Sequence, residues 1–565
     1  MQSIPDHYRL GGYAGDVEDA LKRLSEGKFI ERIRDHDHTL WSSQPDEIVN
    51  RLGWLDSPKS MRSQLAEIDG FCAALREEGY QQALLLGMGG SSLAPEVFRH
   101  TFGVQEGWID LAVLDSTDPE RILRETERLD RKKTLFIVST KSGGTVETIS
   151  FFKYFYRLVA ETQGQEEAGR HFVAITDSGS SLIDLAGECR FRKIFLNDPN
   201  LGGRYSALSH FGCVPAALGG MDLDRLLARA EREMERSGIN IPVMDNPGLV
   251  LGAAIGECAR QGRDKLTFFI APALRSFGDW VEQLIAESTG KYGKGILPVV
   301  GERPGAVAVY GTDRLFVFLE DGETEFLPGF ADAVAQAGHP VIRFSVDDHY
   351  GLGSQLYRWE LATAVAGSLL KINPFDQPDV ETAKRLARRM VSEYLEKGAF
   401  PAESPMLTEG PVDVYGEVSG VSLGEVLREF IGRKNDKGYI SLQAYVDTRP
   451  SINCLLDELR TLVRDRTGLA TTLGYGPRFL HSTGQLHKGD AGNGLFIQIT
   501  ARDRKDCLIP NHPGGSVSSM SFGILKAAQA RGDREALQER KRRVVRFHFN
   551  GSAEDGLRHL ISSLP

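Results

Sequence analysis

The stretch 136–148 combines the residue types that bind a small anion. Its apolar run ends at Val138 and gives way to hydroxylated residues, Lys141 and two glycines. An amphipathic pattern begins at Val146, so the predicted order is strand, small-residue loop and helix N-terminus. Unpaired N–H groups at a helix N-terminus bind phosphate, and hydroxyl and ammonium groups would add to them. The candidate ligands are Thr140, Lys141, Ser142, Thr145 and Thr148. An ordinary turn with Ser and Thr caps is the alternative, and the loop alone favours neither.

Two glycine-containing turns could face the same ligand. A GMGGS turn at 87–91 follows an apolar strand but lacks the third glycine of a dinucleotide loop, although Asp115 could serve a ribose. We therefore interpret Gly90 as a residue that leaves space for a small polar ligand, and Ser91 as a residue that offers this ligand a hydroxyl group. Arg204 stands in GGRYS, where it could stabilise negative charge. A surface turn with a solvated arginine is the alternative.

Two titratable residues complete the candidates. Glu302 follows a short strand at 296–300, and burial against apolar walls would raise its pKa toward that of a general base. Lys384 lies about two helical turns after Pro378, a residue that suits the first turn of a helix. Taken singly, each residue also fits a solvated side chain.

These loops require a scaffold that brings their ends together. Between residues 81 and 197, five near-continuous apolar strands alternate with helices, which predicts a doubly wound parallel sheet with ligands at the carboxyl ends of its strands. A shorter set at 266–344 repeats the pattern, and a third, smaller α/β or α+β domain follows a linker at 392–420. The predicted divisions are an N-terminal helical segment at 1–60 and domains at 61–240, 241–395 and 420–565.

Composition limits the class of protein. The chain of 565 residues carries 67 basic and 77 acidic residues, and its net charge of −10 argues against nonspecific nucleic-acid binding. Its six cysteines form no CxxC pair or Cys/His cluster, which predicts neither disulfides nor a structural metal and fits a reducing compartment. Because no secretory signal or membrane-spanning apolar run is present, we expect a soluble cytoplasmic protein.

The motifs together resemble the phosphoglucose isomerase family across residues 35–390. GMGGSSLAP resembles its GxGGSxLGP loop, and residues 140–148 resemble its SKTxTTxET phosphate loop. GGRYS, the ESTGK at 287–291, Gly301-Glu302 and the NPFDQP at 373–378 then follow in the order of the family. Six motifs in sequence are far more specific than any one of them.

The resemblance implies two sugar-isomerase (SIS) domains, no metal or cofactor, and a homodimer. It also implies the interconversion of glucose 6-phosphate and fructose 6-phosphate through a cis-enediol, a step of glycolysis and gluconeogenesis. Glu302 matches the family's base, Arg204 its enediolate-stabilising arginine, and Lys384 the lysine associated with ring opening. The matching substrate-binding residues are Gly90, Ser91, Thr140, Lys141, Ser142, Thr145 and Thr148.

The chain departs from the family in two places. The base usually lies in GEPGTNGQH, but the text here is GERPGAVAVYGTDR, and the family's ring-opening histidine has no clear counterpart. The segment between the base and the last helix, where the family has that histidine, is much shorter here and contains His349. His481 and His487 lie in the stretch HSTGQLHKG of the third domain. Our hypothesis is that this domain returns one of the latter two to the site, because histidine suits proton transfer near neutral pH. A loop-capping role is the alternative.

Residues 420–565 resemble the C-terminal part of long isomerases that are fused to transaldolase. We expect no transaldolase barrel here, because the residues before the first strand are too few for one. Two other functions stay open: an isomerase of another hexose 6-phosphate, such as mannose 6-phosphate, and a noncatalytic phosphosugar-binding regulator. A regulator could dispense with Glu302 and Lys384, and no basic DNA-binding element is attached.

Overall fold

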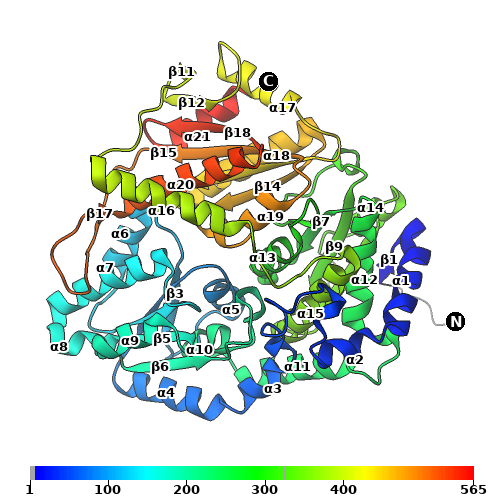
Figure 1. The fold of residues 1–565 in the computed structure, drawn as a ribbon, viewed down its shortest axis with the longest axis horizontal. Coiled ribbons are helices and arrows are strands. Elements are labelled where there is room, and N and C mark those ends of the chain that lie inside the picture. Colours follow the sequence, from blue (N-terminus) through cyan, green and yellow to red (C-terminus); the bar gives the residue numbers. More distant parts are fainter. Residues whose placement is uncertain (1–6, 323–325, 565) are drawn as a thin grey trace.

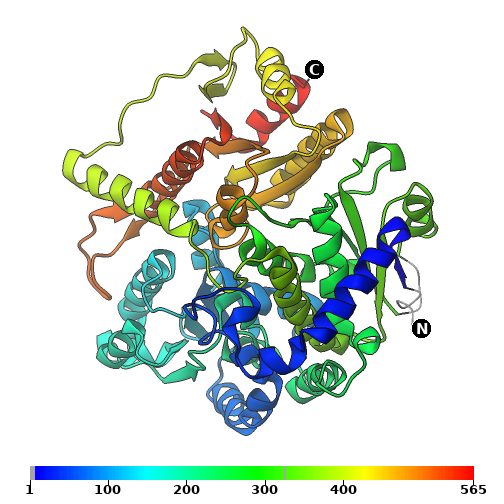
Figure 2. The ribbon, with the colours of Figure 1, turned by 45° about the vertical axis from the view of Figure 1, so that its right-hand side comes forward.

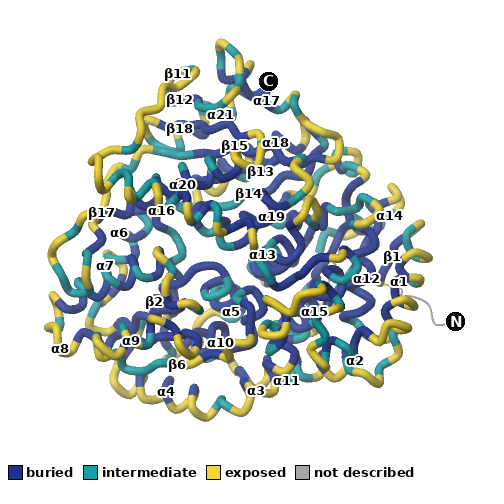
Figure 3. Tube along the Cα trace, viewed as in Figure 1, coloured by how far each residue is buried: buried dark blue, intermediate teal, exposed yellow. Residues whose placement is uncertain are grey.

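Three sheets, each covered by helices, form three lobes that meet at the centre of the molecule (Figures 1 and 2). This architecture comes from a computed structural model that describes residues 7–322 and 326–564. In Figure 1 the first unit lies at the lower left, the second at the right and the third at the top. The sheet strands are almost entirely buried (Figure 3), as their near-continuous apolar runs predict. No helix in the described ranges is long and apolar enough to cross a membrane.

The first unit contains the predicted five-stranded parallel sheet, in the order β3-β2-β4-β5-β6. The chain leaves β2 for β3 on one side and then crosses to β4 on the other. The carboxyl ends of β2 and β4 therefore flank a topological switch point, the usual ligand position in such sheets. The strands are β2 (Gln82–Gly87), β3 (Asp110–Leu114), β4 (Thr134–Ser139), β5 (Phe172–Asp177) and β6 (Lys193–Asn197).

Helices connect and cover these strands. The crossover helices are α5 (Leu93–Phe102), α6 (Pro119–Arg128), α7 (Val146–Gln163) and α9 (Ser181–Glu188), with the short α8 (Gln165–Ala168) after α7. The helices α3 (Ser57–Arg62), α4 (Leu65–Glu77), α10 (His210–Leu218) and α11 (Leu223–Arg236) complete the unit and lead to the second.

The second unit has the order β1-β10-β9-β7-β8, with β1 antiparallel and the others parallel. Because β1 pairs with β10, the N-terminal segment belongs to this sheet, and α1 packs beside α12. The predicted helical segment 1–60 is not helical throughout: Glu47 has a left-handed φ of 54°, and only the 3-10 turn Gly53–Leu55 forms in the stretch 45–55. The strands are β1 (Tyr8–Arg9), β7 (Lys265–Ile270), β8 (Leu297–Val299), β9 (Arg314–Asp321) and β10 (Val341–Val346).

Helices of the second unit surround α15, a long and Ala-rich helix. Most of α15 is inaccessible to solvent. The helices are α1 (Ala14–Glu26), α2 (Phe29–Arg34), α12 (Pro247–Arg260), α13 (Phe277–Thr289), α14 (Phe330–Gln336) and α15 (Leu352–Leu370). Next comes α16 (Val380–Lys397), which leaves this unit and packs along α20 of the third (Figure 1).

The third unit is α/β and doubly wound, with the order β11-β12-β18-β15-β13-β14. The strands β18, β15, β13 and β14 are parallel, and β11 and β12 extend the sheet with antiparallel pairs. The expected linker 392–420 therefore includes the end of α16 and two strands. The strands are β11 (Leu407–Glu409), β12 (Val412–Gly416), β13 (Tyr439–Tyr445), β14 (Ala470–Tyr475), β15 (Gly494–Ala501) and β18 (Arg543–Phe549), with a small hairpin of β16 (Leu508–Ile509) and β17 (Met520–Ser521).

The helices of the third unit follow its parallel strands. They are α17 (Leu423–Gly432), α18 (Pro450–Thr467), α19 (Gly484–Gly489), α20 (Phe522–Glu539) and α21 (Ala553–Ser562). A 3-10 turn at Arg478–His481 and α19 follow β14 and contain the stretch HSTGQLHKG. Through this segment the third unit reaches the other two.

Candidate functional site

The two loops at the switch point of the first sheet lie against each other. Ser139, the last residue of β4, donates from Oγ to the carbonyl oxygen of Ser91 at 2.9 Å. A Cβ at Gly90 would lie only 2.0 Å from the carbonyl oxygen of Gly203, so this position accepts glycine alone. The close approach brings the GGRYS turn, and with it Arg204, beside the loop that follows β2.

The loop after β4 leaves the N-terminus of α7 open. Thr145 is the N-cap residue, yet its side chain caps no N–H group and instead shares a hydrogen bond of 2.9 Å with Thr140. By contrast, Asp118 caps α6 and Ser180 caps α9. The first-turn N–H groups of an 18-residue helix are thus available to an anion.

Side chains around this loop supply further donors. The Lys141 ammonium pairs with Asp177 and also reaches the carbonyl oxygen of Pro199 at 3.4 Å. Ser142 is exposed, and the buried hydroxyl of Thr148 has no hydrogen-bond partner in the described part of the chain. The structure therefore gathers the predicted anion ligands around one helix N-terminus.

Arg204 is a buried cross-link between the first two units. Its Nε donates to Ser288 Oγ at 2.8 Å, and Nη1 lies 2.9 Å from Gln377 Oε1 and 3.3 Å from Glu287 Oε1. Nη2 donates to the carbonyl oxygens of Pro374 and Asp376. All three nitrogens of the guanidinium group are thus engaged. A substrate oxygen could bind Arg204 only by replacing one of these partners.

The NPFDQP segment is held from both sides by cations. Lys291, whose side chain is fully buried, donates to the carbonyl oxygens of Asn373 and Asp376 at 2.7 Å and pairs with the Asp376 carboxylate at 2.6 Å. Burial, followed by repulsion from Arg204, lowers the pKa of Lys291 to about 8. The GGR, ESTGK and NPFDQP motifs thus form one hydrogen-bonded network.

Glu287 is a carboxylate of this network to which the sequence analysis gave no role. It lies near the end of α13 with its side chain 13% exposed, beside Arg204 at 3.3 Å. Gln283, one helical turn earlier, donates to its Oε2 at 3.1 Å. The signal available in the sequence was its place in ESTGK, between two motifs that were assigned to the site.

The third unit inserts its 476–489 stretch where the other two units meet. Arg478 pairs with Asp115 of the first unit at 2.6 Å and with Asp279 of the second at 3.5 Å. Gln485 donates to the carbonyl oxygen of Gly290 at 2.9 Å and to Asp379 at 2.8 Å. We call the meeting place of the loops 87–91 and 140–145, Arg204, Glu287 and this stretch the junction.

Of the three candidate histidines, all of them in the described ranges, only His481 forms a side-chain hydrogen bond with α7. His481 accepts a hydrogen bond from Gln283 through its carbonyl oxygen, and its Nε2 lies 3.0 Å from Glu147 Oε1, in the first turn of α7. His487 is buried against Tyr439, and burial holds its pKa well below the usual value. His349 instead pairs with Asp321 at the end of β9.

Lys384 approaches the junction from α16. Its ammonium pairs with Glu381 at 2.8 Å, and 38% of its side chain is exposed. Burial alone would raise the pKa of Glu147, but His481 and, more weakly, Lys384 hold that pKa below its usual value. Lys384 therefore lies close enough to Glu147 to act on its charge.

Glu302 occupies a different environment from the one expected. It forms a bidentate, almost completely buried ion pair with Arg314, and Arg464 of the third unit lies 3.8 Å away. Arg314 also donates to Thr267 at 2.9 Å. No hydrogen bond or ion pair among the described residues connects Glu302 with Arg204, Glu287 or the loop 140–145.

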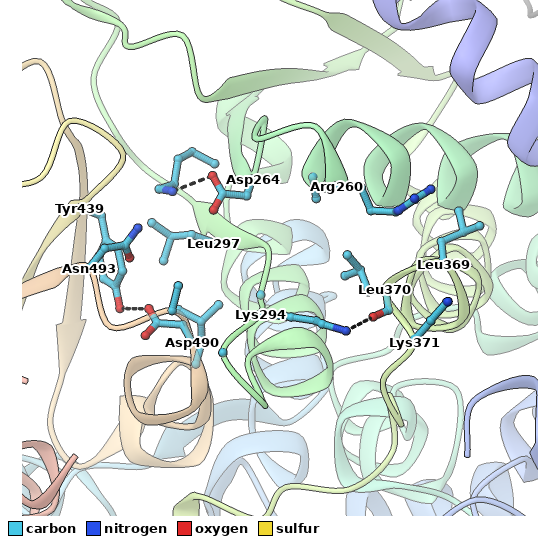
Figure 4. A pocket seen from close by; sticks show the side chains of 16 residues that line it. Arg260, Asp264, Lys294, Leu297, Leu369, Leu370, Lys371, Tyr439, Asp490 and Asn493 are labelled. Atoms are coloured by element: carbon cyan, nitrogen blue, oxygen red, sulfur yellow. Dashed lines mark hydrogen bonds and ion pairs between the residues drawn. The ribbon is translucent and has the colours of Figure 1, made fainter. Parts of the chain in front are cut away.

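A cavity of about 470 Å³ lies between the second and third units (Figure 4). It opens at the amino ends of β7, β8 and β13, and none of the predicted site residues lines it. Asp264 pairs with Lys265, Asp490 accepts from Tyr439, and Lys294 donates to the carbonyl oxygen of Leu370. Within residues 7–322 and 326–564, no group of three or more His, Cys, Asp or Glu could hold a metal ion.

The fold is that of a doubly wound α/β protein whose first sheet presents an uncapped helix N-terminus at its switch point. A sequence model of the family "Phosphoglucose isomerase" matches residues 64–311. A glucose-6-phosphate isomerase of Carboxydothermus hydrogenoformans is 30% identical over 421 residues, which cover 64% of this chain and 90% of that protein. The chain therefore belongs to the phosphoglucose isomerase family.

Other comparisons agree. A glucose-6-phosphate isomerase of Rubrobacter xylanophilus is 29% identical over 422 residues, 66% of this chain and 94% of that protein. The crystal structure of a hypothetical protein from Thermus thermophilus has a TM-score of 0.56 at 26% identity and covers 67% of this chain and 95% of its own. A glucose-6-phosphate isomerase structure from Chlamydia trachomatis has a TM-score of 0.58 at 19% identity, covers 68% and 87%, and supports the fold alone.

Proposed function

We propose that the protein is an aldose–ketose isomerase that interconverts glucose 6-phosphate and fructose 6-phosphate. One observation carries this proposal: in a chain of the phosphoglucose isomerase family, the uncapped N-terminus of α7 lies at the switch point of the first sheet. The substrate phosphate binds there, where aligned N–H groups favour a dianion. Thr140, Lys141, Ser142, Thr145 and Thr148 surround it, and Gly90 and Ser91 lie beside the sugar.

The reaction moves a proton between C2 and C1, which requires a carboxylate base. Two residues are candidates. Family resemblance supports Glu302, although its carboxylate is bound by Arg314. Position supports Glu287, which is partly exposed in the junction beside Arg204. The proposal retains Glu302 as the assigned base and treats Glu287 as its rival, to be separated by experiment.

Two cations complete the proposed mechanism. Arg204 stabilises the enediolate, a charge that develops only during the reaction, if the substrate oxygen replaces the amide of Gln377. Lys384 supplies a positive charge near Glu147 and takes part in ring opening. The active protein is proposed to be a cytoplasmic homodimer, with SIS domains at 61–240 and 241–395, a helical segment at 1–60 and a third domain at 420–565.

The test is turnover of both hexose 6-phosphates by the purified protein. We expect conversion of glucose 6-phosphate to fructose 6-phosphate, and a preference for mannose 6-phosphate would instead indicate the related isomerase. Glu302→Gln and Glu287→Gln are compared, because the variant of the true base loses activity by about 10²-fold or more. Wild-type protein that binds these substrates without turning them over would contradict the enzyme and indicate a phosphosugar-binding regulator.

A further inference from the structure

We propose that the third unit is part of the catalytic apparatus, because its His481 and the buried Glu147 of the first unit form a proton-transfer pair that opens the sugar ring. The inference rests on the proposed isomerase function and assigns one of its steps. The match to the family model ends at residue 311, well before the third unit begins at β11. Glu147 therefore lies within the matched region, whereas His481 comes from a segment outside it.

The position of His481 places its imidazole near the phosphate loop. Its Nε2 lies 3.0 Å from Glu147 Oε1, and Glu147 belongs to the first turn of α7, two residues after Thr145. A phosphate bound at that helix N-terminus would anchor a hexose within reach of residues around the same turn. His481 keeps 16% of its side chain exposed, so a substrate can approach it.

Glu147 is built to orient this imidazole. Only 4% of the residue is exposed, and its Oε1 also accepts from Nε2 of Gln529 at 2.6 Å. Gln529 is itself fixed by Thr117, which donates to its Oε1 at 2.8 Å. The third unit thus provides two of the groups that bind Glu147, His481 and Gln529. With Nε2–H donated to the carboxylate, Nδ1 is left without a hydrogen bond in the described part of the chain.

The charges around the pair favour a proton donor. The pKa of Glu147 remains low despite burial, because His481 and Lys384 stabilise its ionised form. An ionised carboxylate in turn stabilises an imidazolium. Two other titratable groups lie close to the pair. Glu381 faces Lys384, which chiefly lowers its pKa, and the pKa of the buried Tyr445 is raised by burial and, more weakly, by Asp533 and Glu147. A buried carboxylate that holds an imidazole is the arrangement used in general acid–base catalysis.

The chemical step follows from the cyclic form of the substrate. The imidazolium of His481 donates its proton to the ring oxygen O5 as the C1–O5 bond breaks, and that electron pair goes to O5. The C1=O bond forms as the O1 hydroxyl releases its proton to water, and the imidazole later regains a proton from water. No oxidant, reductant or metal enters the balance. The base then acts on the open-chain aldehyde.

Docking contacts hold His481 in place without belonging to the pair. Arg478 anchors the stretch before it to Asp115, and Gln485 anchors the stretch after it to Gly290 and Asp379. Lys488 and Asp533 add a buried ion pair of 2.7 Å within the third unit. A variant of Gln485 weakens docking but leaves the imidazole–carboxylate pair chemically intact, so it is the matched control.

The experiment measures ring opening separately from isomerisation. Exchange NMR reports the interconversion of the α and β anomers of glucose 6-phosphate, and a coupled assay reports isomerisation. For His481→Gln we expect both enzyme-catalysed rates to fall about 10²–10⁴-fold, whereas the variant of the base (Glu302→Gln or Glu287→Gln) loses isomerisation but keeps anomer exchange. In the pH profile of kcat/KM, His481→Gln should lose one limb, and Gln485→Ala should keep both.

Glu147→Gln keeps a hydrogen bond to the imidazole but removes the charge, and we expect an intermediate loss of anomer exchange. It also provides a test if His481→Gln folds poorly, which circular dichroism would reveal. Unchanged anomer exchange in either folded variant, or an unchanged pH profile in His481→Gln, would overturn this inference alone. A wild-type protein that neither exchanges anomers nor isomerises would overturn the proposed function with it.

Discussion

Glu302 and Arg314 form a bidentate ion pair, with Nη1–Oε2 at 2.8 Å and Nη2–Oε1 at 3.2 Å, and both side chains are at most 1% exposed. The pair lies where the second sheet meets α18 of the third unit. Nε of Arg464, a residue of that helix, is 3.8 Å from Oε1 of Glu302. The carboxylate that the family resemblance assigns to proton transfer is therefore neutralised by two arginines in this arrangement.

Arg314→Met should destabilise the protein by about 3–5 kcal/mol, because the Glu302 carboxylate is left buried without its partner. Urea unfolding measures the change in the free energy of unfolding. Arg389→Met, which removes a partly exposed ion pair with Glu535, is the control and should cost at most about 1 kcal/mol. The double variant Arg314→Met/Glu302→Leu should recover much of the loss, and no recovery would contradict the role of charge burial.

Thr145→Val should weaken substrate binding without changing the fold. The variant removes a hydroxyl at the N-terminus of α7 that now pairs with Thr140. Because the proposed phosphate contact would be equally strong in the ground and transition states, KM should rise about tenfold with kcat nearly constant. Steady-state kinetics and competition by inorganic phosphate measure this. Thr162→Val, near the other end of the same helix, should leave KM unchanged, and an equal rise in both variants would exclude a local effect.

Gly90→Ala should disrupt the contact between the loops 87–91 and 202–206. The added Cβ would lie 2.0 Å from the carbonyl oxygen of Gly203, and the backbone must move to accommodate it. Overpacking of this kind costs about 1–3 kcal/mol or more, and Arg204 should shift with its turn. Thermal unfolding and activity measure both effects. Gly70→Ala on α4, where the new methyl meets nothing within 4 Å, should be neutral or stabilising. Equal melting temperatures in the two variants would refute the steric explanation.

The stability of the protein should decrease between about pH 5 and pH 8 through Glu282 on α13. Burial, followed by repulsion from Asp279, raises the pKa of Glu282 to about 8. Between its ordinary value and this one, the folded state binds a proton that the unfolded state has lost, so rising pH favours unfolding. Relative to Glu282→Gln, the wild type should therefore lose free energy of unfolding over this range.

Denaturant unfolding at several pH values measures that difference. Asp279→Asn removes the repulsion and should move the loss to lower pH, as a second measure of the same group. Parallel pH curves for the wild type and Glu282→Gln would show that Glu282 titrates normally.

Hydrophobic patterns in the sequence were sufficient to predict most of the strands and helices of the first two units. The long apolar strands and helical patterns predicted the two α/β units, because burial on both faces forces near-continuous apolar runs. The strands β11 and β12 were not predicted because both are short and partly exposed. The strand β14 was not predicted because its sequence, ATTLGY, contains two threonines and a glycine in place of a continuous apolar run.

The sequence by itself determined the family, the phosphate loop and the residues that resemble its catalytic set, since these depend on local order. Tertiary structure alone decided which of them meet. It placed His481 against Glu147 and enclosed His487 in the core, although the two lie within six residues. It also paired Glu302 with Arg314 and brought Glu287 to Arg204. The physical reason is that a loop motif fixes its own backbone, whereas the partner of a buried charge comes from a separate element of the fold and depends on how the elements pack.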